Sequence, residues 1–329
     1  MVVLRGLKCV GLLLCAVVMI VCVRVEAQVG PQLLLSPWAE HEHWVASDDQ
    51  PVFIVGNETE GGADIDMVYY PSRGKVKFDK ASKDPKWTLG YKFDAIVVDN
   101  KIGIPGDLND LAVAVGYSVG EIADDWTLDL GVGVGTANDG HWDNEDSWYA
   151  LADAAATWRM DENKIMVVGL SFDGNRNVFP DAPLPFIQFT HYYSQTFQYR
   201  LGLINGVTWR PRKDIELKAD LGSLFNDEVI GIDAKATWFV TEKFHVFGEF
   251  ENVRNGFYQE GQGHERMFYM ANFIDAGVRY IVNEGIDLSG GIGWAFNQRF
   301  ATGFDIRDLT TVAEPEDHML FFLRLKGTF

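Results

Sequence analysis

The chain ends with the stretch Met319-Leu320-Phe321-Phe322-Leu323-Arg324-Leu325-Lys326-Gly327-Thr328-Phe329, in which nonpolar and polar residues alternate. In an extended strand, side chains two positions apart share a face. One face then carries the nonpolar side chains, which are Met319, Phe321, Leu323, Leu325 and Phe329. The other face carries the polar or charged side chains, which are His318, Arg324, Lys326 and Thr328. Such a strand fits a wall between lipid and water, so the stretch predicts one strand of a transmembrane β-barrel.

The same alternation recurs along most of the chain. In residues 126–135 a nonpolar face lies opposite a face of glycine and aspartate, which is unlike a strand buried on both sides. The pattern predicts an all-β, antiparallel transmembrane barrel, and a soluble secreted β-sandwich is the alternative fold. The other alternating runs are 87–95, 111–118, 148–159, 166–172, 215–221, 230–238, 244–251, 274–280 and 286–296.

The connections between these runs differ in length in a regular way. Short polar turns at 160–164, 211–214, 241–243 and 283–285 alternate with longer segments at 137–146, 174–184, 253–266 and 298–317. Short turns at one end and long loops at the other are typical of outer-membrane barrels. Trp and Tyr also recur near the strand ends, as in the aromatic girdles of such barrels.

The number of strands depends on residues 184–210. A turn at Ser194-Gln195-Thr196 and a hairpin at Asn205-Gly206 would give strands 185–193, 196–204 and 206–210, and about 14 strands in total. One long strand over 184–210 would give 12. Both totals are counted from residue 86 onward and are even, as expected when both chain ends lie on one side of the membrane, and the run Asp64–Tyr70 is then outside the count.

The N-terminus has the layout of a secretory signal peptide. Arg5 and Lys8 precede an uncharged run from Cys9 to Val23, and Val25-Glu26-Ala27 is a plausible cleavage site. Residues 1–27 are therefore expected to be removed, together with all three cysteines. Residues 28–60 show no clean strand pattern and are expected to form a periplasmic lead-in or plug, before a barrel over 61–329.

The chain is strongly acidic. Of its 28 bases and 47 acids, residues 1–27 contain three bases and one acid, which leaves 25 bases against 46 acids in the remainder. Nucleic acids are excluded as partners, because binding them needs a basic surface. No sequence pattern indicates a cofactor.

Two resemblances support the same location. The terminal aromatic on the nonpolar face, in the set Phe321, Leu323, Leu325 and Phe329, resembles the assembly signal of bacterial outer-membrane β-barrels. The segments Trp126–Val132, Val168–Arg176, Leu184–Ile187 and Val207–Pro211 resemble an uncharacterised family of bacterial outer-membrane β-barrel proteins, of the porin-like single-chain type. The resemblance implies a bacterial outer-membrane location, with outer-membrane lipids and the barrel-assembly machinery as partners, and no catalytic residues.

The polar face of the predicted strands would line the lumen. Its nine acids and six bases, together with His245, suggest a channel or transport protein for small polar solutes, and a structural or surface-interaction barrel with a filled lumen is the alternative. The lumen-facing candidates are Lys92, Asp94, Asp129, Asp153, Arg159, Glu216, Lys218, Asp220, Asp233, Lys235, His245, Glu249, Glu251, Asp287, Arg324 and Lys326.

Enzymatic and metal chemistry are less well supported by the sequence. A barrel hydrolase acting on lipid or peptide would use His245, but no serine lies at a suggestive spacing, so no catalytic residue is assigned. The loop with Asp139, Asp143, Glu145 and Asp146 is rich in oxygen ligands for Ca²⁺ or Mg²⁺, yet its spacing is that of an ordinary solvated loop. His41, His43 and Asp48 are treated in the same way, so no metal site is assigned.

Overall fold

The structure is a computed structural model that describes residues 45–59, 64–78, 87–100, 103–202, 204–222 and 231–328. The predicted signal peptide and Phe329 lie outside the described residues. No helix in the described part of the chain is long and nonpolar enough to cross a membrane. Apart from the short 3₁₀ helix η1 (Glu145–Ser147), the regular elements are β1 (Val45–Asp49), β2 (Val52–Glu58), β3 (Asp64–Phe78), β4 (Trp87–Asn100), β5 (Asp107–Ala123), β6 (Trp126–Asn138), β7 (Trp148–Asp161), β8 (Lys164–Asp173), β9 (Leu184–Ser194), β10 (Phe197–Gly202), β11 (Ile204–Arg212), β12 (Ile215–Gly222), β13 (Ile232–Phe239), β14 (Phe244–Tyr258), β15 (Arg266–Asn283), β16 (Ile286–Gly303), β17 (Thr310–Ala313) and β18 (His318–Thr328).

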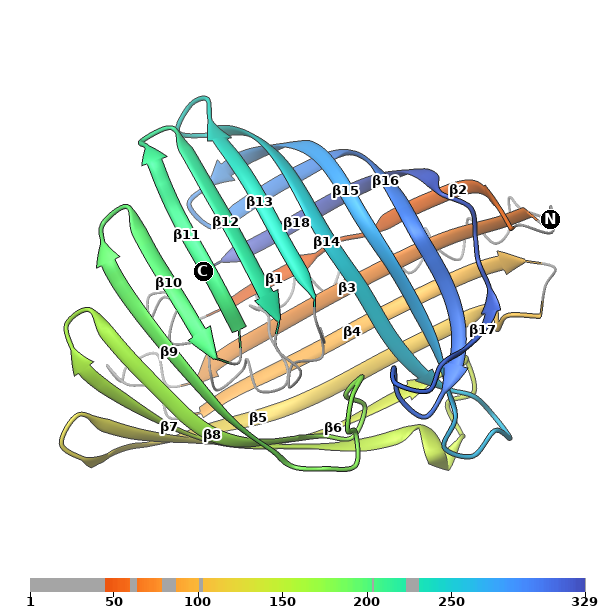
Figure 1. The fold of residues 1–329 in the computed structure, drawn as a ribbon, viewed down its shortest axis with the longest axis horizontal. Helices are drawn as coiled ribbons and strands as arrows, with labels where there is room; N and C mark the ends of the chain where they lie inside the picture. The colour runs from red at the N-terminus through yellow and green to blue at the C-terminus, as the bar shows by residue number, and fades with distance from the viewer. Residues whose placement is uncertain are drawn as a thin grey trace.

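These strands close into one antiparallel barrel, as the sequence predicted (Figure 1). Each strand from β3 to β16 pairs with its neighbour in sequence, and the ring closes because β18 pairs with both β1 and β2. β1 and β2 lie in line against β3 and β18, and β17 and β18 lie in line against β16. Counting each of these pairs as one interrupted strand gives a barrel of 16 strands.

The predicted totals of 14 and 12 strands are therefore wrong. The count of 14 from residue 86 onward agrees with the structure, and the two additional strands precede it. Residues 45–58 form β1 and β2 in the wall. The boundary expected at residue 60, between a lead-in or plug and the barrel, is therefore wrong for this segment. Pro51 interrupts it, because proline has no N–H to donate to a neighbouring strand. The run Asp64–Tyr70, which was left out of the predicted strand count, begins β3.

The turn predicted at residues 194–196 is confirmed between β9 and β10, but the hairpin predicted at Asn205-Gly206 is wrong. The chain reverses instead between Gly202 and Ile204. Gly202 has a φ of 125°, a conformation that favours glycine, and its N–H donates to the side chain of Asn205 at 3.2 Å. Asn205 thus stabilises the turn from within β11 rather than forming it.

The two ends of the barrel differ as predicted (Figure 1). The short turns at 124–125, 162–163, 195–196, 213–214, 240–243 and 284–285 lie at one end, together with the ends of β1 and β18 at Val45 and Thr328. The connections 139–147, 174–183, 259–265 and 304–309 lie at the other, which we call the long-loop end. The β10–β11 connection at this end is short and is the exception.

The outer surface of the wall is nonpolar over most strands. Exposed side chains alternate with inward ones, and aromatic residues at the short-turn end contact one another across strands, as in the Trp87–Tyr117 and Trp126–Trp158 ring pairs at 4.6 and 5.5 Å. A closed barrel with such an exterior has the architecture of a membrane-spanning barrel, because its nonpolar side chains contact hydrocarbon. Exposed examples are Leu89, Val113, Val132, Leu170, Ile187, Leu217, Trp238, Ile274, Val278, Ile292, Met319, Phe321 and Leu323.

Part of the interior is also nonpolar, which the sequence did not predict. The rings of Tyr69 in β3 and Phe273 in β15 lie 6.4 Å apart, and Asn255 in β14 donates to the Tyr69 hydroxyl at 3.2 Å. These strands are not neighbours in the sheet, so their inner faces meet across the barrel. The contact belongs to a buried cluster from β2–β5 and β14–β18. Each large buried side chain of this kind contributes about 1.5–3 kcal/mol to folding.

Candidate functional site in the barrel interior

Contacts between strands that are not neighbours identify the inner face of the wall. Arg324 in β18 donates to Glu249 in β14 at 2.7 Å, although β15 and β16 separate these strands in the sheet. The Tyr149 hydroxyl in β7 donates to Asp110 in β5 at 2.5 Å, across β6. Such bonds can form only on the concave side, so all four side chains lie inside the barrel.

Strand register extends this face around the barrel. Lys235 lies opposite Glu249, Lys218 lies opposite Lys235, and Asp233 lies opposite Glu251. By the same register and the period of two along each strand, the structure places these residues on the inner face: Lys92, Asp94, Asp129, Asp153, Arg159, Glu216, Asp220, His245, Asp287 and Lys326. The inner face also contains Arg73, Asp110, Arg200, Asp275 and Arg279, which were not among the predicted lumen residues, and they bring its charge closer to balance.

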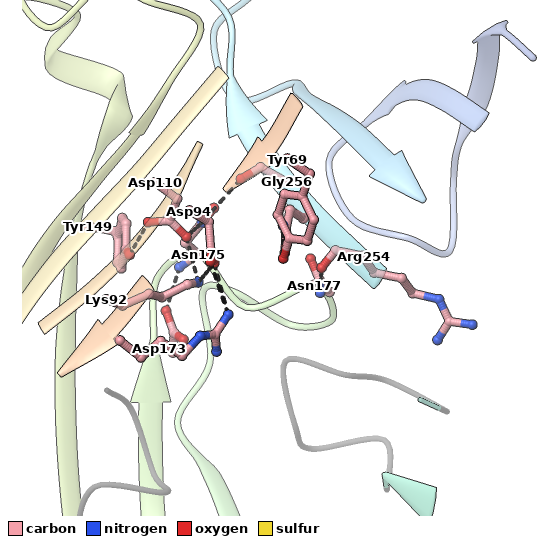
Figure 2. Close-up of polar contacts among 12 residues, drawn as sticks. Tyr69, Lys92, Asp94, Asp110, Tyr149, Asp173, Asn175, Asn177, Arg254 and Gly256 are labelled. Atoms are coloured by element: carbon pink, nitrogen blue, oxygen red, sulfur yellow. Dashed lines mark hydrogen bonds and ion pairs between the residues drawn. The ribbon is translucent and has the colours of Figure 1, made fainter. Parts of the chain in front are cut away.

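A compact polar network occupies the inner face of β3–β5. Asp94 is fully buried and accepts from Arg73 at 3.1 Å, and the Lys92 ammonium lies 3.5 Å from it. Lys92 also donates to Asp110 at 2.6 Å. Asp110 accepts two further bonds, from Tyr149 and, at 3.1 Å, from Asn175 (Figure 2). The network thus links β3, β4, β5 and β7 to the connection between β8 and β9.

That connection, residues 174–183, is called here the inward loop. Asn175, Arg176 and Asn177 are all buried. The Asn175 and Asn177 side-chain amides donate to the backbone oxygens of Gly256 at 3.1 Å and Arg254 at 2.9 Å, both in β14 (Figure 2). β13 pairs with β14 only as far as Glu251, so these amides satisfy carbonyls at the part of the β14 edge beyond that pairing. The inward loop therefore crosses the interior from β8 to β14.

Arg266, the first residue of β15, holds the inward loop in place. Its side chain is fully buried and donates five hydrogen bonds, which use all its N–H groups. The acceptors are the backbone and side-chain oxygens of Asn175 at 3.0 Å, the Arg176 carbonyl at 3.1 Å, and the Phe304 carbonyl at 2.8 and 3.0 Å. Because Phe304 belongs to the β16–β17 connection, Arg266 joins two loops to one strand.

The interior of β6–β13 has a different lining. Glycines on the inner face allow large side chains to lie flat against the wall, and a Cβ at Gly135 would lie 2.2 Å from the Tyr149 ring. A Cβ at Gly169 would lie 2.3 Å from Phe186 in the same way. Thr127 and Arg159, near the short-turn end, are exposed. This half of the interior therefore combines small, polar and flattened side chains with two small nonpolar clusters, which include Leu151 and Val167, and its inward side chains near the short-turn end are exposed.

Two loops contact each other at the long-loop end. His141 in the β6–β7 connection lies with Nδ1 3.0 Å from Asp139 and with Nε2 3.2 Å from Glu260 in the β14–β15 connection. Asp139 also accepts from the Glu260 N–H at 3.0 Å, and β14 bridges to β6 at Tyr258 and Asn138. The hydrogen bond to Asp139, followed by the charges of Asp139 and Glu260, raises the pKa of His141 above its ordinary value.

The loop contact at His141 should weaken as the pH rises. Because folding raises the pKa of His141, protonation stabilises the contact fully below the unfolded value of about 6.5, and this stabilisation is lost as the pH rises through the folded value. Once corrected for intrinsic exchange, hydrogen exchange of the Glu260 amide should accelerate over that range. His141→Gln should abolish the pH dependence, whereas His264→Gln, in the same loop as Glu260, should leave it intact. An unchanged profile in His141→Gln would contradict the assignment.

Other residues singled out in the sequence are not brought into a common site. His245 is buried with its ring edge-on to Phe239 at 4.7 Å, and its Nδ1 has no hydrogen-bond partner among the described residues, so no nucleophile is bonded there. Within the described ranges, no three His, Cys, Asp or Glu side chains are placed to hold a metal ion. Asp143, Glu145 and Asp146 lie in or next to η1, while His41 and His43 lie outside the described residues.

Comparison with known proteins yields outer-membrane barrels. No protein-family model matches the chain, and no curated protein matches it. Among solved structures, a bacterial polysaccharide outer membrane secretin is 9% identical with a TM-score of 0.39, over 87% of this chain and 99% of that one. Omp33 of Acinetobacter baumannii is 12% identical with a TM-score of 0.37, over 87% and 98%, and the NanC porin is 11% identical with a TM-score of 0.30, over 86% and 100%.

These structures are bacterial outer-membrane barrels, and the present chain is a single-chain β-barrel. Identities and TM-scores of this size do not assign the chain to a family. The assignment of the fold as a barrel therefore depends on the closed strand pairing, and the assignment of the interior site depends on the contacts described above.

Proposed function

We propose that the protein is an outer-membrane channel for small polar solutes, and that the solutes pass along the inner face of β6–β13. The observation that carries this proposal is the contrast between the two halves of the interior. The half formed by β2–β5 and β14–β18 contains a large packed nonpolar cluster, whereas the half formed by β6–β13 has smaller nonpolar clusters, which include Leu151 and Val167, among glycine and polar residues. A barrel that served only as a scaffold would have no need to leave one half polar.

In this proposal the inward loop is the constriction. It lies beyond the water-accessible inner face of β6–β13, and its bonds to Arg254 and Gly256 hold it across the interior. Its anchors, Arg266 and Asp110, come from the opposite part of the wall. Passage of a solute to the long-loop end would require the loop to move or the solute to pass along it.

A filled structural barrel is the second candidate. It is favoured by the nonpolar cluster of β2–β5 and β14–β18 and by the complete use of the Arg266 donors, both of which resist opening. In this case the long loops, rather than the lumen, would carry the function as a surface for interaction. No observation favours hydrolysis over these two candidates.

Planar-bilayer recording separates the two candidates. Refolded protein, checked by its heat-modifiable mobility on gels, should give discrete and reproducible single-channel steps if the polar half is a passage. Silence from protein that is demonstrably folded and inserted would reject the channel and favour the filled barrel. Small sugars and amino acids of increasing size, added to one side, would then define the width of the passage.

The route to the membrane is also part of the proposal. Residues 1–27 would direct export and be cleaved, and the set Phe321, Leu323, Leu325 and Phe329 would be recognised by the barrel-assembly machinery. The described members of this set lie on the outer face of β18, where Phe321 and Leu323 are exposed. The outer-membrane lipids would contact the same face, and the segment before β1 would lie on the periplasmic side.

A further inference from the structure

Opposite charges on the inner face of β10–β15 and β18 are shared unevenly. Asp220 is bound by both Arg200 and Lys218, the latter at 2.7 Å. Glu249 is bound by both Lys235 and Arg324, each at 2.7 Å. Four cationic side chains are therefore concentrated on two carboxylates.

Two carboxylates on the strands that flank β14 are left without such partners. Asp233 and Asp275 each have a buried Oδ1 with no hydrogen-bond partner among the described residues. Asp275 is only 8% exposed, so its unbonded oxygen is not compensated by bulk water. A buried acceptor of this kind carries the full cost of removing it from water.

Strand register increases this cost. Asp275 lies directly opposite Glu249, and Asp233 lies directly opposite Asp220. Like charges in directly opposed positions of an antiparallel pair are destabilising. Lys218 and Lys235 are opposed in the same way, so the strands do not arrange their charges for stability alone. Like charges in opposed positions are expected where a protein binds a ligand.

The cations nearby are held in place by more than one contact. The Lys235 ammonium lies 4.4 Å from the centre of the Phe247 ring, and the Arg324 guanidinium lies 5.8 Å from the Phe247 ring and 5.4 Å from the Phe322 ring. Contact with these aromatic rings favours the positions in which Lys235 and Arg324 form ion pairs with Glu249. The interior thus presents unused acceptors at Asp233 and Asp275.

We propose that Asp275, aided by the charge of Asp233 on the other side of β14, forms a binding site for a small organic cation with a primary ammonium group. An ammonium group carries three N–H donors and a positive charge, which match the unbonded Oδ1 of Asp275 and the carboxylates around it. A metal ion fits less well, because no three ligating side chains are placed around one point in the described residues. The inference rests on the proposed function, since it names the class of solute that the channel would select.

The test compares two monovalent cations. Isothermal titration calorimetry of the folded barrel in detergent should show ethylammonium binding more tightly than tetramethylammonium, which has no N–H donor, by at least about tenfold, a ratio that follows from losing a charge-assisted hydrogen bond. Asp233→Asn should weaken the binding of both cations, and Asp275→Asn should abolish the preference between them. Asp287→Asn, which removes a carboxylate paired with Arg279 on the same inner face, should preserve it.

Equal affinity for the two cations in the unaltered protein, or a preference that survives Asp275→Asn, would overturn the site. The outcome is separable from that of the channel proposal. A barrel that conducts but does not distinguish the two cations retains its function and loses this site. A silent barrel that still prefers ethylammonium in detergent retains the site and loses the channel. Heat-modifiable mobility of each variant establishes that it is folded.

Discussion

Arg266→Met should increase the single-channel conductance of the barrel, or the fraction of time that it is open, by on the order of a hundredfold. The substitution keeps a long side chain but removes the five hydrogen bonds that hold Asn175, Arg176 and Phe304. A hydrogen bond from a charged donor contributes about 1.5–3 kcal/mol, and each 1.4 kcal/mol is tenfold in an equilibrium. The loss of two such bonds therefore accounts for the expected shift between a docked and an undocked inward loop.

A matched variant keeps this prediction specific. Arg212→Met makes the same change at the short-turn end, where Arg212 is exposed and binds Asp214 at 2.6 Å. It should leave conductance unchanged, because exposed ion pairs contribute little. If folded Arg266→Met conducts no more than the unaltered protein, the inward loop is not the constriction. Protection of residues 174–183 from protease, compared between the two variants, reports loop release independently of conductance.

Gly135→Ala should destabilise the barrel by about 1–3 kcal/mol, the usual cost of forcing extra volume into a packed site. Its Cβ would lie 2.2 Å from the Tyr149 ring and 2.5 Å from the Tyr149 hydroxyl, so Tyr149 would have to leave the wall. That movement would break the 2.5 Å hydrogen bond to Asp110. Urea titration in detergent should therefore show a lower unfolding midpoint.

A double-mutant cycle identifies the cause. All three nearest contacts of a Cβ at Gly135 belong to Tyr149, so Gly135→Ala should cost little in a Tyr149→Ala background. At Gly169 the new Cβ would also meet the Ala154 carbonyl at 2.4 Å, so Phe186→Ala should rescue Gly169→Ala only in part. If the losses in free energy of unfolding caused by Gly135→Ala and Tyr149→Ala are additive, the position of the Tyr149 ring does not depend on the glycine.

Most of the wall was predictable because its inner and outer faces differ. In β6 and β12, nonpolar side chains alternate with glycine, lysine or acids, and the alternation identifies each strand. The first part of β3 lacks this contrast. Ile65, Met67 and Tyr69 pack into the interior cluster, so the nonpolar face of this segment points inward. The alternation that begins at Asp66 is lost where the partly exposed Val68 and Tyr70 follow. The break at Pro51 hid β1 and β2 in a similar way.

The interior site was predictable only where it lies on alternating strands. Glu249, Lys235 and Arg324 were identified as lumen residues from their position opposite nonpolar side chains, and the structure brings these three together. Arg266 and Asn175 were not identified, because one begins a strand beyond the alternating region and the other lies in a loop. Their role depends on contacts between residues 91 positions apart, which no local pattern records.

The measurement that tests the barrel most directly is cysteine scanning of β12, since the described residues contain no cysteine. Cysteines at positions 216, 218 and 220 should react with a membrane-impermeant methanethiosulfonate reagent in intact liposomes, whereas those at 217, 219 and 221 should be protected. Spin labels at the second set should instead be relaxed by oxygen dissolved in lipid, because Leu217 and Leu221 are exposed on the outer face. Equal protection of both sets, without relaxation by oxygen at 217 and 221, would mean that the outer face packs against protein, and would contradict a wall between lipid and water.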